Sequence, residues 1–417
     1  MKYRERTLEG YIDPLLELFP VVAVTGPRQA GKSTLINHYI AKDWKYYTLD
    51  NRELLLRVRT DPTLFVRGFG SHVAIDEAQK CPDLFHSIKE LVDRGFDYKI
   101  ILSGSANFLL LKSITESLAG RVGLLEMMPF SLSEKMGRES NGFVKVLCES
   151  ESVEDLRERL ARFEGERLSD VELLEFVLNG GFPRIHDFGE QGQRNTWFQN
   201  YVGTYIERDL RDLAQVGDVD TFQKVYRLIA YRNSGILNMS SIASDVGVSV
   251  QTIKNYISIL EASYQVKRLP AYSVEQRKQV IKAPKIYYTD TGLLNYFVQN
   301  DSVERMTSGG DWGGVLEAHV FAELYKEIKD MAPRPGLYYW RTNNGAEVDF
   351  VLEWKQRLIP VEVKSAATVS PSSLRGLRSF KESQAEGKVP FAVVLYRGDE
   401  VVFLNDWTVG VPLGMLY

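Results

Sequence analysis

One stretch near the N-terminus limits what this chain can fold into. A β-branched run, Val21–Thr25, is followed by a glycine-rich segment and then by a helical pattern, Thr34–Ile40. The segment between them fits the pattern G-x-x-x-x-G-K-[ST], in the strand–loop–helix context that phosphate binding requires. The sequence therefore predicts an α/β nucleotide-binding domain built on a parallel sheet.

The chemistry of this loop assigns roles to its residues. Backbone N–H groups of such a turn surround phosphates, and the helix that follows adds its dipole. We expect Lys32 to reach the β- and γ-phosphates of ATP and Ser33 to bind Mg²⁺. The predicted nucleotide-binding residues are Gly26, Pro27, Arg28, Gln29, Ala30, Gly31, Lys32, Ser33 and Thr34.

A second apolar strand, His72–Ile75, delivers two carboxylates, Asp76 and Glu77, at its carboxyl end. The carboxyl ends of parallel strands meet at one edge of the sheet, where the phosphate loop also lies. Asp76 is predicted to hold Mg²⁺ and Glu77 to polarise the attacking water.

These segments resemble prokaryotic AAA-type ATPases of the archaeal-ATPase kind. The resemblance rests on the ordered set Gly26–Thr34, Ile75–Gln79, Leu102–Ser105 and Leu118–Arg121. In one bacterial and archaeal branch, this ATPase is fused to a C-terminal domain of unknown function. The motifs that fit that branch are Gly180–Pro183, Tyr205–Asp209 and Lys282–Leu293. The resemblance implies an ATPase but does not settle a biological role.

The same resemblance implies three further roles at the nucleotide site. A polar residue after the third strand senses the γ-phosphate, with Ser105 the first choice and Asn107 the second; the alternative is a plain glycine–serine turn. Arg121 is implied as an arginine finger for a neighbouring subunit, the alternative being an intramolecular salt bridge. A finger implies a homo-oligomer, for example a hexameric ring. Arg184, in a helical lid, is a candidate γ-phosphate contact or an ordinary surface arginine.

Residues 222–285 differ in charge from the rest of the chain. They contain ten basic and three acidic residues, a net charge of +7, within a protein of net charge −4. Such a concentration of positive charge is typical of a segment that binds a polyanion.

The apolar spacing in this segment predicts a helix-turn-helix, Met239–Val246 and Val250–Ala262, with Ser249 as the cap of the second helix. Two strands and a basic wing, 276–282, complete a predicted winged helix. The predicted DNA-binding residues are Gln251, Thr252, Lys254, Asn255, Arg277, Lys278 and Lys282. Winged helices also serve as protein-contact modules, which is the alternative.

The C-terminal part is predicted to be α/β again, with a helix at Val315–Met331 and several strands. Glu362 and Lys364 fall on one face of a strand, because side chains alternate. With Asp349 on the neighbouring strand and Glu317 on the helix, they resemble the PD-(D/E)XK restriction-endonuclease-like fold. This resemblance implies Mg²⁺ bound by Glu317, Asp349 and Glu362, and catalytic roles for Asp349, Glu362 and Lys364. The alternative is alternating strands with solvated charges.

The composition limits the class of protein to which this chain can belong. The chain has 417 residues, 44% of them hydrophobic and 25% charged, which is ordinary for a globular protein. It has 2 cysteines, which argues against a disulfide scaffold and favours a reducing compartment. No apolar run reaches the ~18–20 residues that a membrane helix needs. We expect a cytoplasmic protein with no membrane association.

Together these features predict four domains: a P-loop ATPase core at 1–135, a helical lid at 136–220, a winged helix at 221–300 and a nuclease-like domain at 301–417. The predicted function is an ATP-binding and ATP-hydrolysing protein that binds branched or structured DNA and remodels it or gates its cleavage. The alternative is a nucleotide-dependent switch, or a transcription or toxin–antitoxin regulator, whose nuclease-like domain does not cleave.

Overall fold

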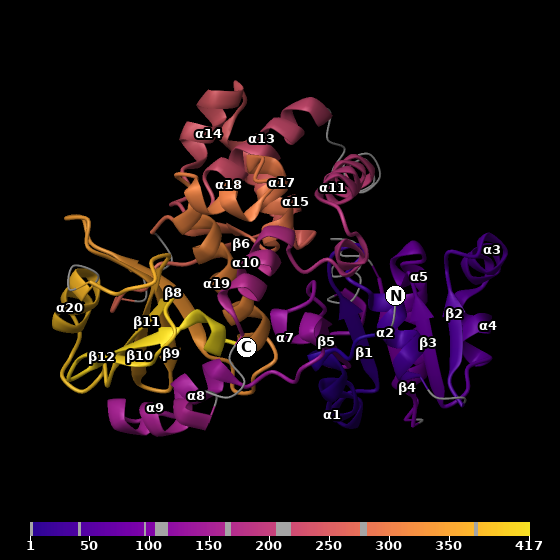
Figure 1. The fold of residues 1–417 in the computed structure, drawn as a ribbon. Helices are drawn as coiled ribbons and strands as arrows, with labels where there is room; N and C mark the ends of the chain where they lie inside the picture. Colours follow the sequence, from indigo (N-terminus) through magenta and orange to yellow (C-terminus); the bar gives the residue numbers. More distant parts are fainter. Residues whose placement is uncertain are drawn as a thin grey trace.

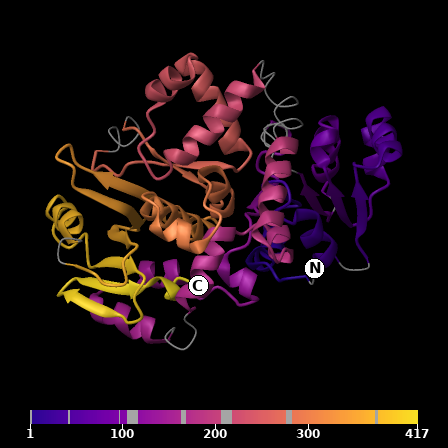
Figure 2. The same ribbon diagram turned by 45° about the horizontal axis from the view of Figure 1, so that its top comes forward.

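Two β-sheets lie on opposite sides of the molecule, with helices between and above them (Figure 1). A view turned by 45° shows the same separation (Figure 2). The computed structural model describes residues 3–40, 43–95, 97–104, 116–162, 168–205, 218–275, 282–370 and 374–417.

The N-terminal sheet has five parallel strands in the order β2-β3-β4-β1-β5. The strands are β1 (Val21–Thr25), β2 (Lys45–Thr48), β3 (His72–Asp76), β4 (Lys99–Ser103) and β5 (Val122–Glu126). All five residues of β1 are buried, as expected for the inner strand of a parallel sheet covered on both faces. Because β4 lies between β1 and β3, the end of β4 separates the loop after β1 from the acidic residues after β3.

Helices cover both faces of this sheet. They are η1 (Thr7–Tyr11), α1 (Ile12–Leu18), α2 (Lys32–Tyr39), α3 (Arg52–Thr60), α4 (Pro62–Arg67), η2 (Ala78–Lys80) and α5 (Asp83–Val92). Alternate residues of β1 enter two separate cores: Val21 packs with residues of α5, and Val22 packs with residues of α1 and α2. The period of two along the strand thus builds a three-layer unit.

The middle segment is helical, but it is not a lid on the N-terminal sheet along its whole length. Its elements are α7 (Leu132–Met136), α8 (Phe143–Glu149), α9 (Val153–Leu160), α10 (Asp170–Asn179), η4 (Pro183–Asp187) and α11 (Gln191–Tyr205). In Figure 1, α8 and α9 lie below the C-terminal sheet. Arg357 of that sheet donates to the carbonyls of Cys148 (2.8 Å) and Ser150 (2.7 Å). The amphipathic pattern was sufficient to predict helices, but it did not reveal which sheet they cover.

Three helices and a two-stranded sheet follow. They are α13 (Val219–Tyr231), α14 (Met239–Val246), α15 (Val250–Ala262), β6 (Val266–Leu269) and β7 (Lys285–Tyr288). The turn between α14 and α15 passes through Gly247 at φ +73°, and the Ser249 side chain accepts from the Thr252 N–H, so it caps α15. Strands β6 and β7 pair antiparallel.

The C-terminal unit contains a six-stranded mixed sheet in the order β12-β13-β11-β10-β9-β8. Its strands are β8 (Gly336–Arg341), β9 (Glu347–Trp354), β10 (Arg357–Lys364), β11 (Ala392–Tyr396), β12 (Val402–Asn405) and β13 (Thr408–Pro412). Its helices are α17 (Thr291–Val298), α18 (Val303–Ser308), α19 (Trp312–Ile328), α20 (Arg375–Glu382) and η7 (Leu413–Met415).

One apolar core contains buried residues from Leu132 to Tyr417, and a separate core, which includes Val348, Leu377 and Phe380, lies between α20 and the C-terminal sheet. The predicted boundary near residue 135 therefore coincides with a change of core, whereas the predicted boundaries near 220 and 300 cross a shared one. Both cysteines, Cys81 and Cys148, are buried and free. Within the described part of the chain, no helix combines the length and apolarity needed to cross a bilayer.

Candidate functional site

The glycine-rich loop connects β1 directly to α2. Gly26 has φ +147°, and a Cβ on it would lie 2.1 Å from the Met127 carbonyl oxygen, so the position accepts only glycine. Gly31 precedes α2 in the left-handed region, and Lys32 and Ser33 form the first turn of the helix. The loop therefore places backbone N–H groups and a helix N-terminus at the carboxyl edge of the sheet, as an anion site requires.

The Lys32 side chain folds back over this loop. Its ammonium donates to the carbonyls of Gly26 (2.9 Å) and Pro27 (2.8 Å), and the residue is buried. These contacts hold the charge inside the turn. The other predicted loop residues range from buried (Ala30) to exposed (Gln29, Ser33, Thr34).

Asp76 ends β3 beside the loop and is held by two side chains. Ser103, the last residue of β4, donates to Asp76 Oδ1 at 2.5 Å, and Tyr46 donates to Oδ2 at 3.1 Å. Sequence reasoning missed Ser103, which is fully buried between the two strands that carry the loop and Asp76. The sequence does carry a signal for Ser103, because it is the polar last residue of an otherwise apolar strand beside β1.

Glu77 follows in the left-handed region, at φ +55°. A non-glycine residue there is uncommon and turns its side chain away from the direction that a continuing strand would give. Gln79 donates to Glu77 Oε2 at 2.5 Å, which fixes the carboxylate close to the start of η2. The candidate γ-phosphate sensors Ser105 and Asn107 lie outside the described residues.

Arg121 is paired within its own chain. Its guanidinium makes a bidentate ion pair with Asp93 (Nε–Oδ1 2.5 Å, Nη2–Oδ2 3.0 Å). The Arg121 carbonyl accepts from the N–H of Val21, the first residue of β1, which places Arg121 at the amino edge of the sheet. That edge is opposite to the glycine-rich loop. Arg121 is thus held in an intramolecular salt bridge, which was the alternative to an arginine finger. To reach the nucleotide of a neighbouring subunit, it would have to leave Asp93.

Arg184 is likewise a surface residue. Its side chain is 58% exposed and pairs with Asp187 at 2.8 Å. The motif that precedes it has a clearer role, since the Gly181 N–H donates to Asp290 Oδ2 at 2.7 Å and the Gly181 carbonyl accepts from Phe130. The motif thus joins the exit of the N-terminal sheet to the N-cap of α17.

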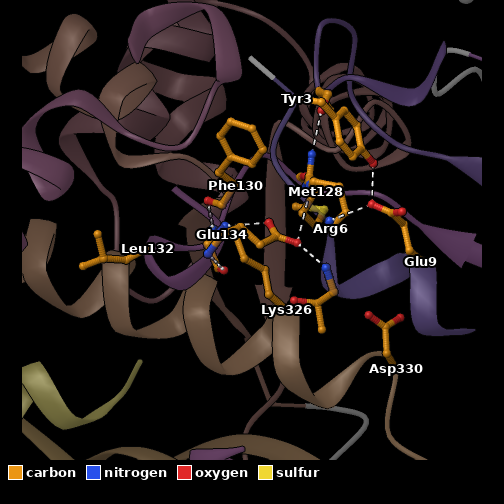
Figure 3. A network of polar contacts seen from close by, with 12 residues as sticks. Tyr3, Arg6, Glu9, Met128, Phe130, Leu132, Glu134, Lys326 and Asp330 are labelled. Carbon is orange, nitrogen blue, oxygen red and sulfur yellow. Dashed lines mark hydrogen bonds and ion pairs between the residues drawn. The ribbon is translucent and has the colours of Figure 1, made fainter. Parts of the chain in front are cut away.

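A second residue that sequence reasoning did not single out is Arg6, which lies beside Met128 and Glu134 (Figure 3) and also contacts the loop. Arg6 donates to the carbonyls of Ala30 (3.0 Å) and Met128 (2.6 Å), and it forms an ion pair with Glu134 at 3.2 Å. Burial opposes ionisation of Glu134, but the Arg6 charge holds the pKa of Glu134 below its ordinary value. Glu134 also closes a capping box with Ser131 at the start of α7. The contact ties the phosphate loop to the helical segment, beside a cavity of about 650 Å³.

The helix-turn-helix presents the predicted residues on its outer side. Gln251, Lys254 and Asn255 are exposed, and Thr252 is half-buried against its cap, Ser249. Lys282 is exposed, whereas Arg277 and Lys278 lie outside the described residues.

Not all of the positive charge in this segment is available at the surface. Four of its ten basic residues are paired with carboxylates: Arg232 with Asp245, Lys267 with Glu126, Arg268 with Glu261, and Lys285 with Glu317 and Glu347. The net charge of +7 therefore overstated the exposed charge, because composition does not distinguish a paired cation from a free one. Lys224, Arg227, Lys254 and Lys282 remain exposed.

The fold brings the predicted C-terminal carboxylates together. Lys364 donates to Glu362 Oε1 at 2.6 Å, and Asp349 Oδ2 accepts from the Val363 N–H at 2.8 Å. Burial raises the pKa of Glu362 to about 8, with a further contribution from Asp349. Burial and Asp349 also raise the pKa of Glu317 to about 7.

An unpredicted lysine lies among these carboxylates. Lys285 of β7 places its ammonium 2.9 Å from Glu317 Oε1, 2.5 Å from Glu347 Oε1 and 4.0 Å from Asp349 Oδ1. In the described residues, no group of three or more carboxylate, histidine or cysteine side chains is arranged to hold a metal ion. The predicted Mg²⁺ set of Glu317, Asp349 and Glu362 therefore does not fit a metal with Lys285 in place.

One hydrogen bond links the nucleotide-binding edge to the helix-turn-helix segment. The hydroxyls of Thr25, the last residue of β1, and Tyr264, in the turn after α15, are 2.8 Å apart. Tyr264 is buried and packs with Met128 and Tyr325. Burial, with Glu126 nearby, raises the pKa of Tyr264, so its hydroxyl stays protonated at any physiological pH.

Comparison with known proteins agrees with the first of these sites. Residues 18–136 match the family described as AAA domain. The glycine-rich loop and the five parallel strands described above lie within these residues. Residues 171–304 and 312–416 match two domains of unknown function, DUF8612 and DUF4143.

The relatives span most of the chain. The uncharacterized protein Rv2008c of Mycobacterium tuberculosis is 29% identical over 395 residues, which cover 94% of this chain and 80% of the relative. The uncharacterized protein MJ1544 of Methanocaldococcus jannaschii is 22% identical over 355 residues, covering 81% of this chain and 73% of the relative.

Among solved structures, the Walker-type ATPase PABY2304 of Pyrococcus abyssi is similar with a TM-score of 0.43 and 15% identity, covering 70% of this chain and 94% of that one. The replication initiator DnaA bound to AMPPCP and single-stranded DNA gives a TM-score of 0.29 and 14% identity, covering 61% and 86%. Both TM-scores are below 0.5, so neither similarity establishes a shared fold.

Proposed function

We propose that this chain binds and hydrolyses ATP at the glycine-rich loop and uses the nucleotide state to control DNA binding by residues 219–288. The observation that carries the proposal is the Thr25–Tyr264 hydrogen bond, which joins the strand leading into the loop to the turn after α15. The biological DNA is branched or structured, as the nuclease-like resemblance of the C-terminal unit suggests.

Each residue at the loop has a defined task. Lys32 exchanges its two carbonyl acceptors for the β- and γ-phosphates, and the loop N–H groups and the α2 N-terminus bind the remaining phosphate oxygens. Ser33 and Asp76 would hold Mg²⁺, which screens the phosphate charge. Ser103 and Tyr46 orient Asp76, and Glu77 accepts a proton from the attacking water.

The DNA-facing surface is the outer side of α15, with Gln251, Lys254 and Asn255, together with the exposed Lys282. Side chains on such a helix reach base edges and phosphates of the major groove. The following β6–β7 pair corresponds to the strands of a winged helix. Because much of the positive charge is paired internally, few side chains can neutralise phosphates, and we expect a modest affinity that depends only weakly on salt.

The nucleotide state would reach this surface through contacts at the carboxyl edge of the ATPase sheet. Besides Thr25–Tyr264, Lys267 of β6 lies 3.5 Å from Glu126 Oε1 at the end of β5, and Tyr325 donates to Glu126 Oε2 at 2.5 Å. A shift of the β1 or β5 ends on phosphate binding would therefore move the base of α15 and β6.

The test is binding of labelled linear, forked and four-way DNA, measured with ATP, ADP or no nucleotide, together with phosphate release with and without DNA. We expect nucleotide-dependent DNA affinity in the wild type and none in Lys32→Ala. Lys254→Ala should weaken binding, while Lys388→Ala, which removes an exposed lysine far from α15, should not. If no DNA in the panel binds at moderate salt and none changes turnover, the proposal fails.

A second function is favoured by Lys285, whose ammonium lies among the C-terminal carboxylates. In this alternative, the chain is a slow nucleotide switch or a regulator of transcription or of a toxin–antitoxin type, and its nuclease-like unit does not cleave. It predicts that Lys364→Ala leaves DNA intact and activity unchanged. Cleavage with Mg²⁺ or Mn²⁺ that disappears in Asp349→Ala and Lys364→Ala would exclude it.

A further inference from the structure

The lysine among the C-terminal carboxylates comes from a different part of the chain than its partners. Lys285 is the first residue of β7, the strand that pairs with β6 after the helix-turn-helix, whereas its partners come from α19 and β9. Its side chain is only 3% exposed, so this long charged group is buried close to Glu317, Glu347 and Asp349.

We propose that Lys285 is the resident cation of this carboxylate cluster, so that the C-terminal unit holds its carboxylates together without a divalent metal. A buried ammonium is stable only when it is paired and hydrogen-bonded. Here the pairing comes from two elements, because the Lys285 ammonium lies 2.9 Å from Glu317 Oε1 of α19 and 2.5 Å from Glu347 Oε1 of β9.

One oxygen of each of Glu317, Asp349 and Glu362 is already engaged by a protein donor. Glu317 Oε1 accepts from Lys285 and from the Tyr287 hydroxyl at 2.5 Å, and Asp349 Oδ2 accepts from the Val363 N–H. Glu362 Oε1 accepts from Lys364. A divalent cation needs several of these oxygens at once and would have to displace an ammonium to obtain them.

Glu362 Oε2 is buried and has no hydrogen-bond partner, and the residue is only 8% exposed. The cluster contains four carboxylates, Glu317, Glu347, Asp349 and Glu362, against the ammonium groups of Lys285 and Lys364 and the guanidinium of Arg341, which lies 3.6 Å from Glu347 Oε2. Loss of the Lys285 ammonium would leave Glu317, Glu347 and Asp349 without the cation that they share, so removing it should create a site that takes up a divalent cation.

Lys285 also connects the two-stranded sheet to the C-terminal sheet. The ion pairs of Lys285 fasten the beginning of β7 to α19 and β9, and the Tyr339 hydroxyl donates to the Ala283 carbonyl two residues earlier. The two-stranded sheet after α15 is therefore anchored to the C-terminal sheet by charge. The inference does not depend on ATP hydrolysis or on DNA binding.

The experiment is a titration of nucleotide-free full-length protein with Mn²⁺, followed by electron paramagnetic resonance. The variants are Lys285→Met, Lys285→Arg, the double variant Lys285→Met/Glu317→Gln, and Lys364→Met as the matched control that removes the other ammonium. We expect no Mn²⁺ site in the wild type, Lys285→Arg or Lys364→Met. In Lys285→Met we expect one site per chain, at least about tenfold tighter than any binding in the wild type, and its loss in the double variant.

Two results would overturn the inference. The first is a wild-type Mn²⁺ site that disappears in Asp349→Asn, because the cluster would then bind metal with Lys285 present. This measurement does not depend on whether Lys285→Met folds. The second is a folded Lys285→Met, with a wild-type circular dichroism spectrum, that gains no Mn²⁺ site.

Discussion

The hydroxyl groups of Thr25 and Tyr264 lie 2.8 Å apart, although 239 positions separate them in the sequence. Thr25 ends the strand that leads into the phosphate loop, and Tyr264 forms the turn between α15 and β6. Tyr264 is held at φ +59°, where a bulky side chain costs about 1–3 kcal/mol of backbone strain. The surrounding contacts hold a strained residue in place at the junction of two units.

The first prediction concerns this contact. Tyr264→Phe keeps the ring packed against Met128 and Tyr325 but removes the hydrogen bond to Thr25. We expect the free energy of unfolding to fall by about 1 kcal/mol, because one buried hydrogen bond is lost. We also expect the nucleotide dependence of DNA affinity to fall strongly while nucleotide-free DNA affinity is retained, as measured by fluorescence anisotropy.

Tyr226→Phe is the matched control. Its hydroxyl donates to Gln265 Oε1 at 2.6 Å, inside the core of the helix-turn-helix segment and away from β1. A similar loss of stability without a change in nucleotide dependence would separate the two roles. If both variants respond to nucleotide like the wild type, Thr25–Tyr264 does not transmit the state of the site.

The second prediction concerns the nucleotide site itself. Lys32→Ala removes the phosphate contact, and Glu77→Gln keeps the shape of the site but removes the proton acceptor. We expect both to lower ATP turnover by about 100-fold or more, since general-base removal alone has this magnitude. Only Glu77→Gln should still bind a fluorescent ATP analogue with wild-type affinity. Glu77→Gln with normal phosphate release would remove Glu77 from the mechanism.

The sequence predicts secondary structure well where the pattern is local. The strand and helix on either side of the glycine-rich loop, and the two helices on either side of Gly247, each depend on residues that are neighbours in the chain. Sequence reasoning failed for Lys285, which looked like one more cation of a basic segment and is in fact paired with carboxylates 32 and more positions away.

The position of α8 and α9 was missed for a similar reason. Their apolar residues, such as Phe143 and Leu156, show that one face is buried, but periodicity does not say against what. Arg357 of the C-terminal sheet, which donates to the carbonyls of Cys148 and Ser150 at the end of α8, decides the placement. Such long-range polar contacts have no signal in a single sequence.

The third prediction addresses Arg121. The pair with Asp93 is partly exposed, and water screens such pairs so that they contribute little to stability. If the pair is only structural, Arg121→Ala and Asp93→Ala should lower the melting temperature by the same small amount and leave ATP turnover close to wild type, which is the outcome that the structure favours. An arginine finger would instead give a loss of about 10³ in turnover in Arg121→Ala alone.

The fourth prediction tests the joint between Gly181 and Asp290. A Cβ at Gly181 would lie 2.2 Å from the Phe130 carbonyl oxygen, and one at Gly180 would lie 2.3 Å from Asp290 Oδ1. We expect Gly181→Ala to destabilise the protein by about 3 kcal/mol or more, since backbone atoms must move to admit the methyl group. Gly189→Ala, at a position with nothing within 4 Å, is the control and should melt like the wild type.

The last prediction is a dependence of stability on pH that arises from Glu362. Its pKa is 4.5 in an unconstrained chain and is raised to about 8 in the fold by burial and by Asp349. The folded protein therefore binds more protons than the unfolded chain between these values, and its stability must fall as pH rises through that range. Glu362→Gln mimics the protonated form, so its melting temperature should fall less between pH 6 and pH 8 than that of the wild type (measured by differential scanning calorimetry). Part of the slope should persist, because the pKa of Glu317 is raised to about 7 in the same cluster.

The control is Glu386→Gln, at an exposed position, which should retain the full wild-type slope. Equal slopes in Glu362→Gln and the wild type would mean that Glu362 is already ionised in the folded protein, with its unpartnered oxygen satisfied from solution.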